Sequence, residues 1–428
     1  MKKVLIVQPH EYYLFNYLVS LAPYLNKNNF DVSVYTTDSK VFEKFDIAGV
    51  KVFFFPRHLI YLQKLSDRYL IRPFSWFAFY LWGFRNRKLF DVAILPFDNK
   101  LIFLAIKLFF KSCTIHTTVN LVDLNQEIVE YQSHKNHSVV KFFERFLKIR
   151  IAPRFNGKIM KHNFSWYIDK IFGPSVPNHI QGFSGVDLIT VTGKKIKSNL
   201  IESGLNELDT SIAVTGNPNY EGFGKVIEQF DNEKKALFQK SLGLQGRKNI
   251  FTLFLSPSIF SEIQIKEILL VLQRIISAYP DCTLFLKFHP KTLPKFLELF
   301  EKKLSDLKAQ FVISKNFAGD EFNLKLILIS EAIFQKQSTV GFIAMQAKTP
   351  IISYNLFDTG YFDDLYEILD CSMHCKSIFE LDQALLDIKN PIAIEKLTIR
   401  QINACDNFCK ETNSPHQEIA SALHAISK

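Results

Sequence analysis

Short apolar runs alternate with longer amphipathic stretches through the first half of the chain. The run Lys3–Val7 has the length of a strand, and the stretch Tyr12–Asn28 repeats leucine at helical spacing along one face. Further strands are expected at 31–35, 50–55, 91–95, 113–116, 187–191 and 212–215, with helices at 101–110 and 194–203. This alternation of strand and helix predicts a parallel, doubly wound sheet.

The same pattern restarts in the second half, after a partly helical, linker-like zone at 219–245. Strands are expected at 250–255, 283–288, 310–314, 332–334 and 350–354, with helices at 261–279, 293–304, 320–329 and 338–347. We therefore expect an α/β protein with two Rossmann-type domains that face a cleft, at 1–218 and 246–393. Residues 394–428 are expected to be helical and to cross back onto the first domain.

Positive charge is concentrated in one part of the chain. The net charge is +10, and residues 51–170 hold 20 Lys and Arg against 8 Asp and Glu, together with all three Trp. Such a region favours an anionic surface or ligand nearby. Within it, the aromatic stretch Phe74–Phe84 lies between Arg72 and Arg85, which suits either a segment lying on a membrane surface or a buried helix. No apolar run is long enough to span a bilayer, and the run Val4-Leu5-Ile6-Val7 is too short for the core of a signal peptide. A cytoplasmic protein with peripheral membrane contact is therefore expected.

The six cysteines include two pairs at helical spacing, Cys371 with Cys375 and Cys405 with Cys409. Structural zinc sites use tighter spacing as a rule, and no Cys-x-x-Cys pair occurs. Buried, reduced thiols are the better interpretation, and no metal site is expected.

Two short polar motifs each follow an apolar run in the second half. The first is Lys287-Phe288-His289-Pro290, and the second is Gln337-Ser338-Thr339. Ligands of open α/β sheets bind outside the carboxyl ends of the strands, which is where both motifs are expected. A histidine there can donate a hydrogen bond to a phosphate oxygen, and Lys287 shares its face if the strand continues. The alternative is a packing histidine without a ligand.

Ser338 and Thr339 are suited to begin the helix expected at 338–347. A helix N-terminus presents unpaired N–H groups to anions, so this motif is compatible with a phosphate. Serine and threonine also cap helices with no ligand present, which is the simpler alternative. The occurrence of both motifs in one α/β unit favours a nucleotide-phosphate site. No phosphate-binding loop of the GxxxxGK[ST] type and no nucleic-acid-binding motif occurs.

With these motifs, the chain resembles GT-B-fold glycosyltransferases that build bacterial surface polysaccharides. His289-Pro290 and Ser338-Thr339 match the His-Pro and Ser-Ser/Thr motifs of bacterial sialyl- and polysialyltransferases, and similar motifs occur in capsule Kdo transferases. The turn at Gly216-Asn217-Pro218 is similar to one near the interdomain hinge of many GT-B proteins. The resemblance covers about residues 185–355 and implies a CMP-activated donor. The residues expected to bind the donor are Lys287, His289, Pro290, Ser338, Thr339, Gly216, Asn217 and Ser256.

The chain departs from that family at the catalytic base, because the acidic Asp/Glu-Asp/Glu-Gly motif is absent. A base is still needed to deprotonate an acceptor hydroxyl. Glu11, with His10 beside it, follows the first expected strand and is the first choice. Asp98 and His116, near the ends of two later expected strands, are the rivals.

The resemblance thus implies an inverting, metal-independent glycosyltransferase that needs no cofactor. Its donor would be a CMP-activated sialic-acid-like or Kdo-like sugar, and its acceptor a capsule, lipopolysaccharide or lipid-linked glycan at the membrane. One alternative is a GT-B transferase with a UDP-sugar or CDP-polyol donor, for which Glu331 or Glu321 is a candidate ribose ligand. A second is a catalytically silent GT-B scaffold. A related UDP-N-acetylglucosamine 2-epimerase is less well supported, because no His-Glu-Asn run occurs.

Overall fold

The structure is a computed structural model of the 428-residue chain. It describes residues 1–7, 15–36, 39–54, 89–95, 114–119, 154–155, 158–159, 186–202, 205–208, 210–255, 262–289, 292, 294–304, 307, 310–314, 319–336, 338–357, 365–410 and 414–426. The aromatic stretch Phe74–Phe84 and the helix expected at 101–110 lie outside these residues.

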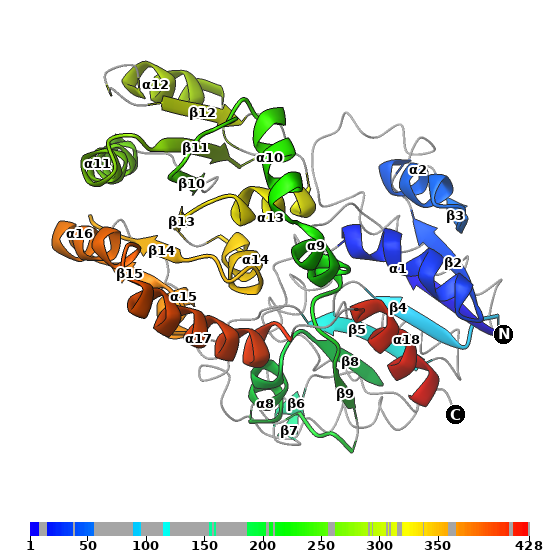
Figure 1. Ribbon diagram of the computed structural model, residues 1–428. Coiled ribbons are helices and arrows are strands. Elements are labelled where there is room, and N and C mark those ends of the chain that lie inside the picture. Colours follow the sequence, from blue (N-terminus) through cyan, green and yellow to red (C-terminus); the bar gives the residue numbers. More distant parts are fainter. Residues whose placement is uncertain are drawn as a thin grey trace, which may run out of the picture. The chain divides into compact units, whose positions relative to one another are not determined.

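The chain forms two compact units. Unit 1 comprises 1–221 and 414–428, and unit 2 comprises 222–413. The polypeptide therefore passes between the units twice, at Glu221/Gly222 and at Asn413/Ser414. Figure 1 shows the helices and strands of each.

Unit 1 is built on a seven-stranded parallel sheet in the order β3-β2-β1-β4-β5-β8-β9. Its strands are β1 (Lys2–Val7), β2 (Phe30–Thr36), β3 (Lys51–Phe54), β4 (Val92–Leu95), β5 (Thr114–Val119), β8 (Leu188–Val191) and β9 (Ser211–Val214). Its helices are α1 (Phe15–Lys27), α2 (Ser39–Ile47), α8 (Lys194–Glu202), the 3-10 turn η3 (Pro218–Tyr220) and α18 (Pro415–Ile426). A two-residue antiparallel pair, β6 (Arg154–Phe155) with β7 (Lys158–Ile159), completes the described elements.

Three helices of unit 1 share one hydrophobic core with the sheet. Leu18 and Leu21 of α1, Phe45 of α2 and Ile419 and Leu423 of α18 are buried together against β1, β2 and β4. Apolar residues recur at helical spacing along α1 and α18, so each helix buries one face. The last helix of the chain thus packs on the N-terminal unit, beside α1 and η3.

Unit 2 is built on a six-stranded parallel sheet in the order β12-β11-β10-β13-β14-β15. Its strands are β10 (Ile250–Leu255), β11 (Thr283–Phe288), β12 (Gln310–Ser314), β13 (Ala332–Gln335), β14 (Ile351–Tyr354) and β15 (Met373–Cys375). Its helices are α9 (Phe223–Gln229), α10 (Asn232–Ser241), α11 (Glu262–Ala278), α12 (Pro294–Leu304), α13 (Asp320–Leu328), α14 (Val340–Gln346), α15 (Leu365–Ile368), α16 (Ile378–Asp387) and α17 (Pro391–Phe408).

The central strands of unit 2 are buried on both faces, as continuous apolar runs in parallel sheets usually are. Residues such as Leu284, Leu286 and Phe334 face the core formed with α11 and α16. Figure 1 shows α13 and α14 on the other side of the sheet. Side chains at alternate positions of one strand therefore enter different layers.

Two segments differ from the arrangement expected from the sequence. Helices α9 and α10 lie within the stretch 219–245 expected as a linker, and both contact α13 in unit 2. Helix α17 packs on α14 through a buried face that includes Leu397 and Ala404, so it stays with unit 2. Of the expected crossing segment, α18 alone belongs to unit 1.

Two further observations concern the described part of the chain. None of its helices combines the length and the apolar character needed to span a bilayer. Five of the six cysteines fall within it, and all five are buried and free of disulfides.

Candidate functional site

The carboxyl edge of the unit 2 sheet gathers polar residues from three strands. His289 follows β11, Lys336 follows β13 and Asn355 follows β14. The strand order reverses between β10 and β13, since β11 and β12 continue on one side and β14 and β15 on the other. This reversal is the topological switch point at which open α/β sheets bind ligands.

Lys287 is a buried lysine near the end of β11. Its side chain is on the opposite face of the strand from Leu286 and Phe288, and the residue is 7% exposed. The ammonium nitrogen lies 5.3 Å from the ring centroid of Phe322 on α13, a cation–π contact. Burial lowers the pKa of Lys287, because the charged form loses hydration. An anion beside it would favour the ammonium again.

His289 comes directly after β11 and is half-buried. Its carbonyl oxygen accepts a hydrogen bond from the Thr292 N–H at 2.9 Å, so the chain turns at once. Burial lowers the pKa of His289, which favours the neutral imidazole at neutral pH. A neutral ring donates one N–H to a phosphate oxygen. Pro290 lies outside the described residues.

Ser338 and Thr339 do not begin the helix as the sequence predicts. Helix α14 begins at Val340, and Thr339 precedes it without a side-chain capping bond. The N–H groups of Val340, Gly341 and Phe342 donate to Ser338 Oγ, Ser338 O and Thr339 O at 3.3, 3.1 and 3.1 Å. These first-turn N–H groups are therefore occupied within the chain. The expectation that they are left unpaired for a phosphate is wrong, and binding of a phosphate by the side chains of Ser338 and Thr339 stays a prediction.

Two buried side chains hold the segment that carries Ser338. Gln335 Oε1 accepts a hydrogen bond from the Ser338 N–H at 2.6 Å, and Gln335 Nε2 donates to Ser353 Oγ at 2.9 Å. From the other side, the Tyr366 hydroxyl donates to the Ser338 carbonyl oxygen at 2.5 Å. The backbone of Ser338 is thus tied to β13, β14 and α15.

A second polar cluster lies beside this segment. Lys336 Nζ is 2.9 Å from Glu267 Oε2 and 2.9 Å from Asn355 Oδ1, and Glu267 Oε1 accepts from the Phe357 N–H at 3.3 Å. Glu267 belongs to α11, so the cluster joins α11 to the ends of β13 and β14. The sequence did not point to five members of this site: Gln335, Lys336, Glu267, Asn355 and Tyr366. Only Gln335 and Lys336 had a signal, since they adjoin the Gln337-Ser338-Thr339 motif.

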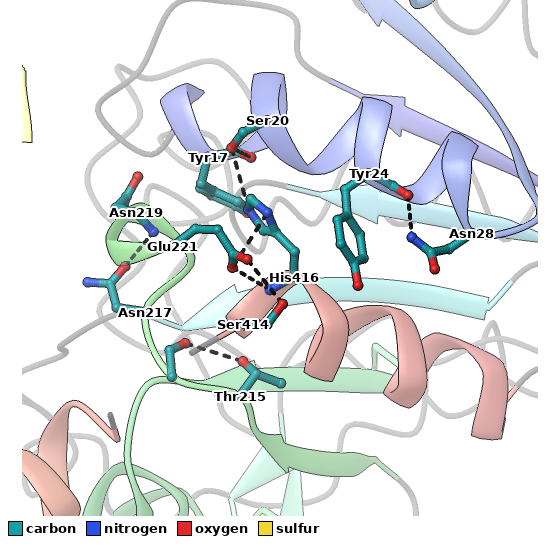
Figure 2. Close-up of polar contacts among 11 residues, drawn as sticks. Tyr17, Ser20, Tyr24, Asn28, Thr215, Asn217, Asn219, Glu221, Ser414 and His416 are labelled. Carbon is teal, nitrogen blue, oxygen red and sulfur yellow. Dashed lines mark hydrogen bonds and ion pairs between the residues drawn. The ribbon is translucent and has the colours of Figure 1, made fainter. Parts of the chain in front are cut away.

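Gly216 and Asn217, also expected to bind the donor, lie in unit 1 in the turn after β9. Figure 2 shows Asn217 in this turn. Gly216 has a φ of 78°, which favours glycine. Asn217 Oδ1 accepts from the Asn219 N–H at 3.0 Å and caps η3. Their described contacts are those of a turn, close to the point where the chain leaves unit 1.

One carboxylate in unit 1, that of Glu221, connects the two places where the chain passes from one unit to the other. Glu221 accepts hydrogen bonds from Ser414 Oγ and from the His416 N–H, both at 3.0 Å (Figure 2). Its Oε2 is also 3.6 Å from Nδ1 of the buried His416 ring. Nε2 of that ring lies 3.4 Å from Ser20 Oγ on α1. Burial lowers the pKa of His416, and Glu221 opposes the shift.

Of the expected catalytic bases, only the backbone of His116 is described. His116 pairs with Ile94 and Leu188 inside β5, which continues to Val119. The expectation that His116 stands at a strand end is therefore wrong, because the following Thr-Thr-Val residues extend the parallel pairing. Glu11, His10, Asp98 and Ser256 lie outside the described residues.

The two candidate ribose ligands are also placed. Glu331 stands before β13, at the amino edge of the sheet and away from Ser338, and its N–H donates to the Ile250 carbonyl oxygen at 2.8 Å. Glu321 pairs with Lys325 one turn later on α13, at 2.6 Å. Neither has a described contact with the Ser338 segment.

No protein-family model matches the chain, and no curated protein matches it in sequence. Solved structures match over its full length. UDP-GlcNAc 2-epimerase from Neisseria meningitidis bound to UDP-GlcNAc has a TM-score of 0.62 at 13% identity, with 99% of this chain and 100% of that chain covered. S. aureus MnaA with UDP has a TM-score of 0.59 at 15% identity, covering 100% and 98%. Anabaena Alr3699/HepE in complex with UDP and glucose has a TM-score of 0.54 at 12% identity, covering 99% and 100%.

The chain has the GT-B fold, with two Rossmann-like domains, as these proteins do. This confirms the predicted fold class. At 12–15% identity, the likeness establishes the fold alone. It supports the GT-B part of the sequence resemblance and does not extend to its sialyltransferase and Kdo-transferase part.

Proposed function

We propose that the chain is a nucleotide-sugar enzyme, a glycosyltransferase that binds a UDP-sugar at the carboxyl edge of the unit 2 sheet. The observation that carries the proposal is the placement of Lys287, His289 and Ser338 around the ends of β11 and β13, at the switch point of a Rossmann-like sheet. These residues supply a cation, an imidazole and a hydroxyl, which are all phosphate ligands.

The charge on the leaving nucleotide determines what these residues would do. Transfer of the sugar leaves a diphosphate with added negative charge, and groups that favour this charge lower the barrier. A buried ammonium such as Lys287 acts strongly on a nearby anion, because little water screens it. His289 and the Ser338 hydroxyl would each donate a hydrogen bond. In this proposal the protein groups stabilise the leaving group.

The structural relatives favour UDP over the CMP donor expected from the sequence. The three relatives named above carry UDP or a UDP-sugar by their descriptions. A CMP-activated acid sugar gains no support from them, so we adopt the UDP-sugar alternative. Transfer to a surface glycan or a lipid-linked glycan, with membrane contact through residues 51–170, stays part of the proposal. Glu11 with His10, or Asp98, remains the proposed base.

Epimerisation of the sugar is the second candidate function, because the relative from Neisseria meningitidis is a UDP-GlcNAc 2-epimerase by its description. The absence of a His-Glu-Asn run in this sequence favours transfer over epimerisation. A third possibility is a scaffold protein without turnover, which would give neither transferred sugar nor epimerised sugar.

The test is a product assay with a panel of UDP-sugars. The purified protein is incubated with each, with and without glycan acceptors, and both UDP release and sugar epimerisation are followed by NMR. We expect acceptor-dependent UDP release that His289→Ala and Ser338→Ala reduce at least about tenfold, the effect of losing one hydrogen bond to a charged group. Ser277→Ala on α11 is the matched control, since its hydroxyl bonds only its own helix at Gln273 O in the described contacts. Epimer without transfer, or no turnover, would overturn the transferase proposal.

A further inference from the structure

The Ser338 segment owes its shape to a tyrosine from another part of unit 2. Tyr366 lies on α15 and is 1% exposed, with its hydroxyl oxygen 2.5 Å from the Ser338 carbonyl oxygen. A buried phenol usually needs a partner for its O–H, and this carbonyl provides it. The bond joins the segment after β14 to the segment after β13.

The ring of Tyr366 fits there only because residue 341 is glycine. A Cβ atom at Gly341 would overlap the ring carbon Cζ of Tyr366 and would lie 2.6 Å from its hydroxyl oxygen. The ring also packs against Phe342, with 5.4 Å between centroids. The phenol is therefore held against the first turn of α14, with its hydroxyl directed at Ser338.

The hydroxyl of Ser338 gains a defined orientation from these contacts. Its oxygen accepts the Val340 N–H at 3.3 Å, and the Ser338 N–H donates to Gln335. The Ser338 carbonyl oxygen accepts from the Tyr366 hydroxyl and from the Gly341 N–H. One lone pair of the hydroxyl is thus used inside the chain, and no acceptor among the described residues takes its proton. Preorganised donors of this kind bind anions without an ordering cost at the time of binding.

We propose that Tyr366 is a positioning residue of the nucleotide site, which sets the direction in which the Ser338 hydroxyl donates to the nucleotide phosphate. The inference rests on the proposed function, because it assumes that the Ser338 segment meets a nucleotide. It assigns a role to a residue that lies 28 positions away and outside both sequence motifs.

The test is calorimetric titration of the full-length protein with UDP. In Tyr366→Phe the ring remains and only the hydroxyl is lost, and we expect UDP to bind about threefold to tenfold more weakly. In a Ser338→Ala background the same change is expected to have no further effect, because its influence passes through the Ser338 hydroxyl. Tyr279→Phe is the matched control: Tyr279 also donates to a backbone carbonyl in unit 2, that of Leu385, at 2.9 Å.

The outcomes separate the two proposals. No UDP binding by the unsubstituted protein overturns the proposed function and this inference with it. The positioning role alone is overturned if Tyr366→Phe leaves the UDP affinity unchanged. It is also overturned if Tyr366→Phe lowers the affinity equally in the unsubstituted protein and in the Ser338→Ala background. If Tyr366→Phe does not fold, Gly341→Ala provides the second measurement, since it displaces the ring and is expected to weaken UDP binding while Tyr279→Phe does not.

Discussion

Lys336 and Glu267 form an ion pair with 2.9 Å between Nζ and Oε2, and the two partners differ in their access to water. The Glu267 side chain is 1% exposed, whereas the Lys336 side chain is 23% exposed. A charge left alone in the interior costs more than one that can reach solvent. Removing Lys336 is therefore expected to cost unit 2 more stability than removing the charge of Glu267.

We predict that Lys336→Met destabilises the protein more than Glu267→Gln does. Lys336→Met leaves a buried carboxylate without its cation, which is expected to lower the free energy of unfolding by about 3–5 kcal/mol. Glu267→Gln leaves a lysine that can reach solvent, and the expected loss is about 1–3 kcal/mol. Urea unfolding followed by circular dichroism measures both. Arg274→Gln on the same helix is the control, because neither side chain of its pair with Asp382 is as buried as that of Glu267, so its loss is expected to cost less than that of Lys336. Equal costs for the two variants would contradict the asymmetry.

Gly341→Ala is predicted to destabilise unit 2 by about 1–3 kcal/mol, because the new methyl group overlaps the Tyr366 ring. The overlap has a specific signature. In a Tyr366→Leu background, where the ring is gone, the same substitution is expected to cost clearly less. Gly319→Ala is the control, since a Cβ there meets nothing within 4 Å. An unchanged cost in the Tyr366→Leu background would show that the ring is not the cause.

Stability should depend on pH through His416. Burial lowers its pKa in the folded protein, so the unfolded chain takes up the proton first as the pH falls below the ordinary value of about 6.5. The free energy of unfolding should therefore fall with decreasing pH in this window, by up to about 1.4 kcal/mol per unit of pKa difference. Thermal unfolding of His416→Gln between about pH 7.5 and about pH 5 should show a weaker pH dependence. His424→Gln, an exposed residue of the same helix, should retain the dependence, and its loss there would contradict the assignment.

UDP affinity should rise as the pH falls through the range in which His289 titrates. Burial lowers the pKa of this histidine without ligand, and a phosphate would favour its charged form, so binding takes up a proton. The affinity is expected to increase as the pH falls from about 8 to below about 6.5, the ordinary pKa of histidine. Titration of UDP itself is removed by comparison with His289→Gln. If both proteins show the same pH dependence, His289 does not contact the phosphate.

The fold was largely predictable because long apolar runs leave few alternatives. The predicted bounds of β10, β11 and β12 agree with the structure residue for residue. Strands β10 and β11 are mostly apolar and are buried along their whole length, which is typical of buried parallel strands, whereas β12 is an edge strand with the short apolar run Phe311-Val312-Ile313. The start of α14 was predicted two residues early: the helix begins at Val340 with Thr339 as its N-cap residue, and Ser338 lies before it with its N–H bonded to Gln335 Oε1.

The part of the candidate site that could be predicted from the sequence lies at strand ends, which the apolar pattern marks. Lys287, His289 and Ser338 were predicted in this way, and their contact with a nucleotide stays a prediction. Glu267 and Tyr366 reach the site from 69 and 28 residues away from their partners. Their contacts depend on how α11 and α15 pack on the sheet, and no local pattern carries that information.

The most direct test of the nucleotide site is calorimetric titration of the unsubstituted protein with UDP and with CMP under the same conditions. The proposal predicts that UDP binds, that CMP binds at least about tenfold more weakly, and that His289→Ala weakens UDP binding by about tenfold or more. Stronger binding of CMP would restore the donor class expected from the sequence. Binding of neither nucleotide would contradict the central claim that the carboxyl edge of unit 2 holds a nucleotide sugar.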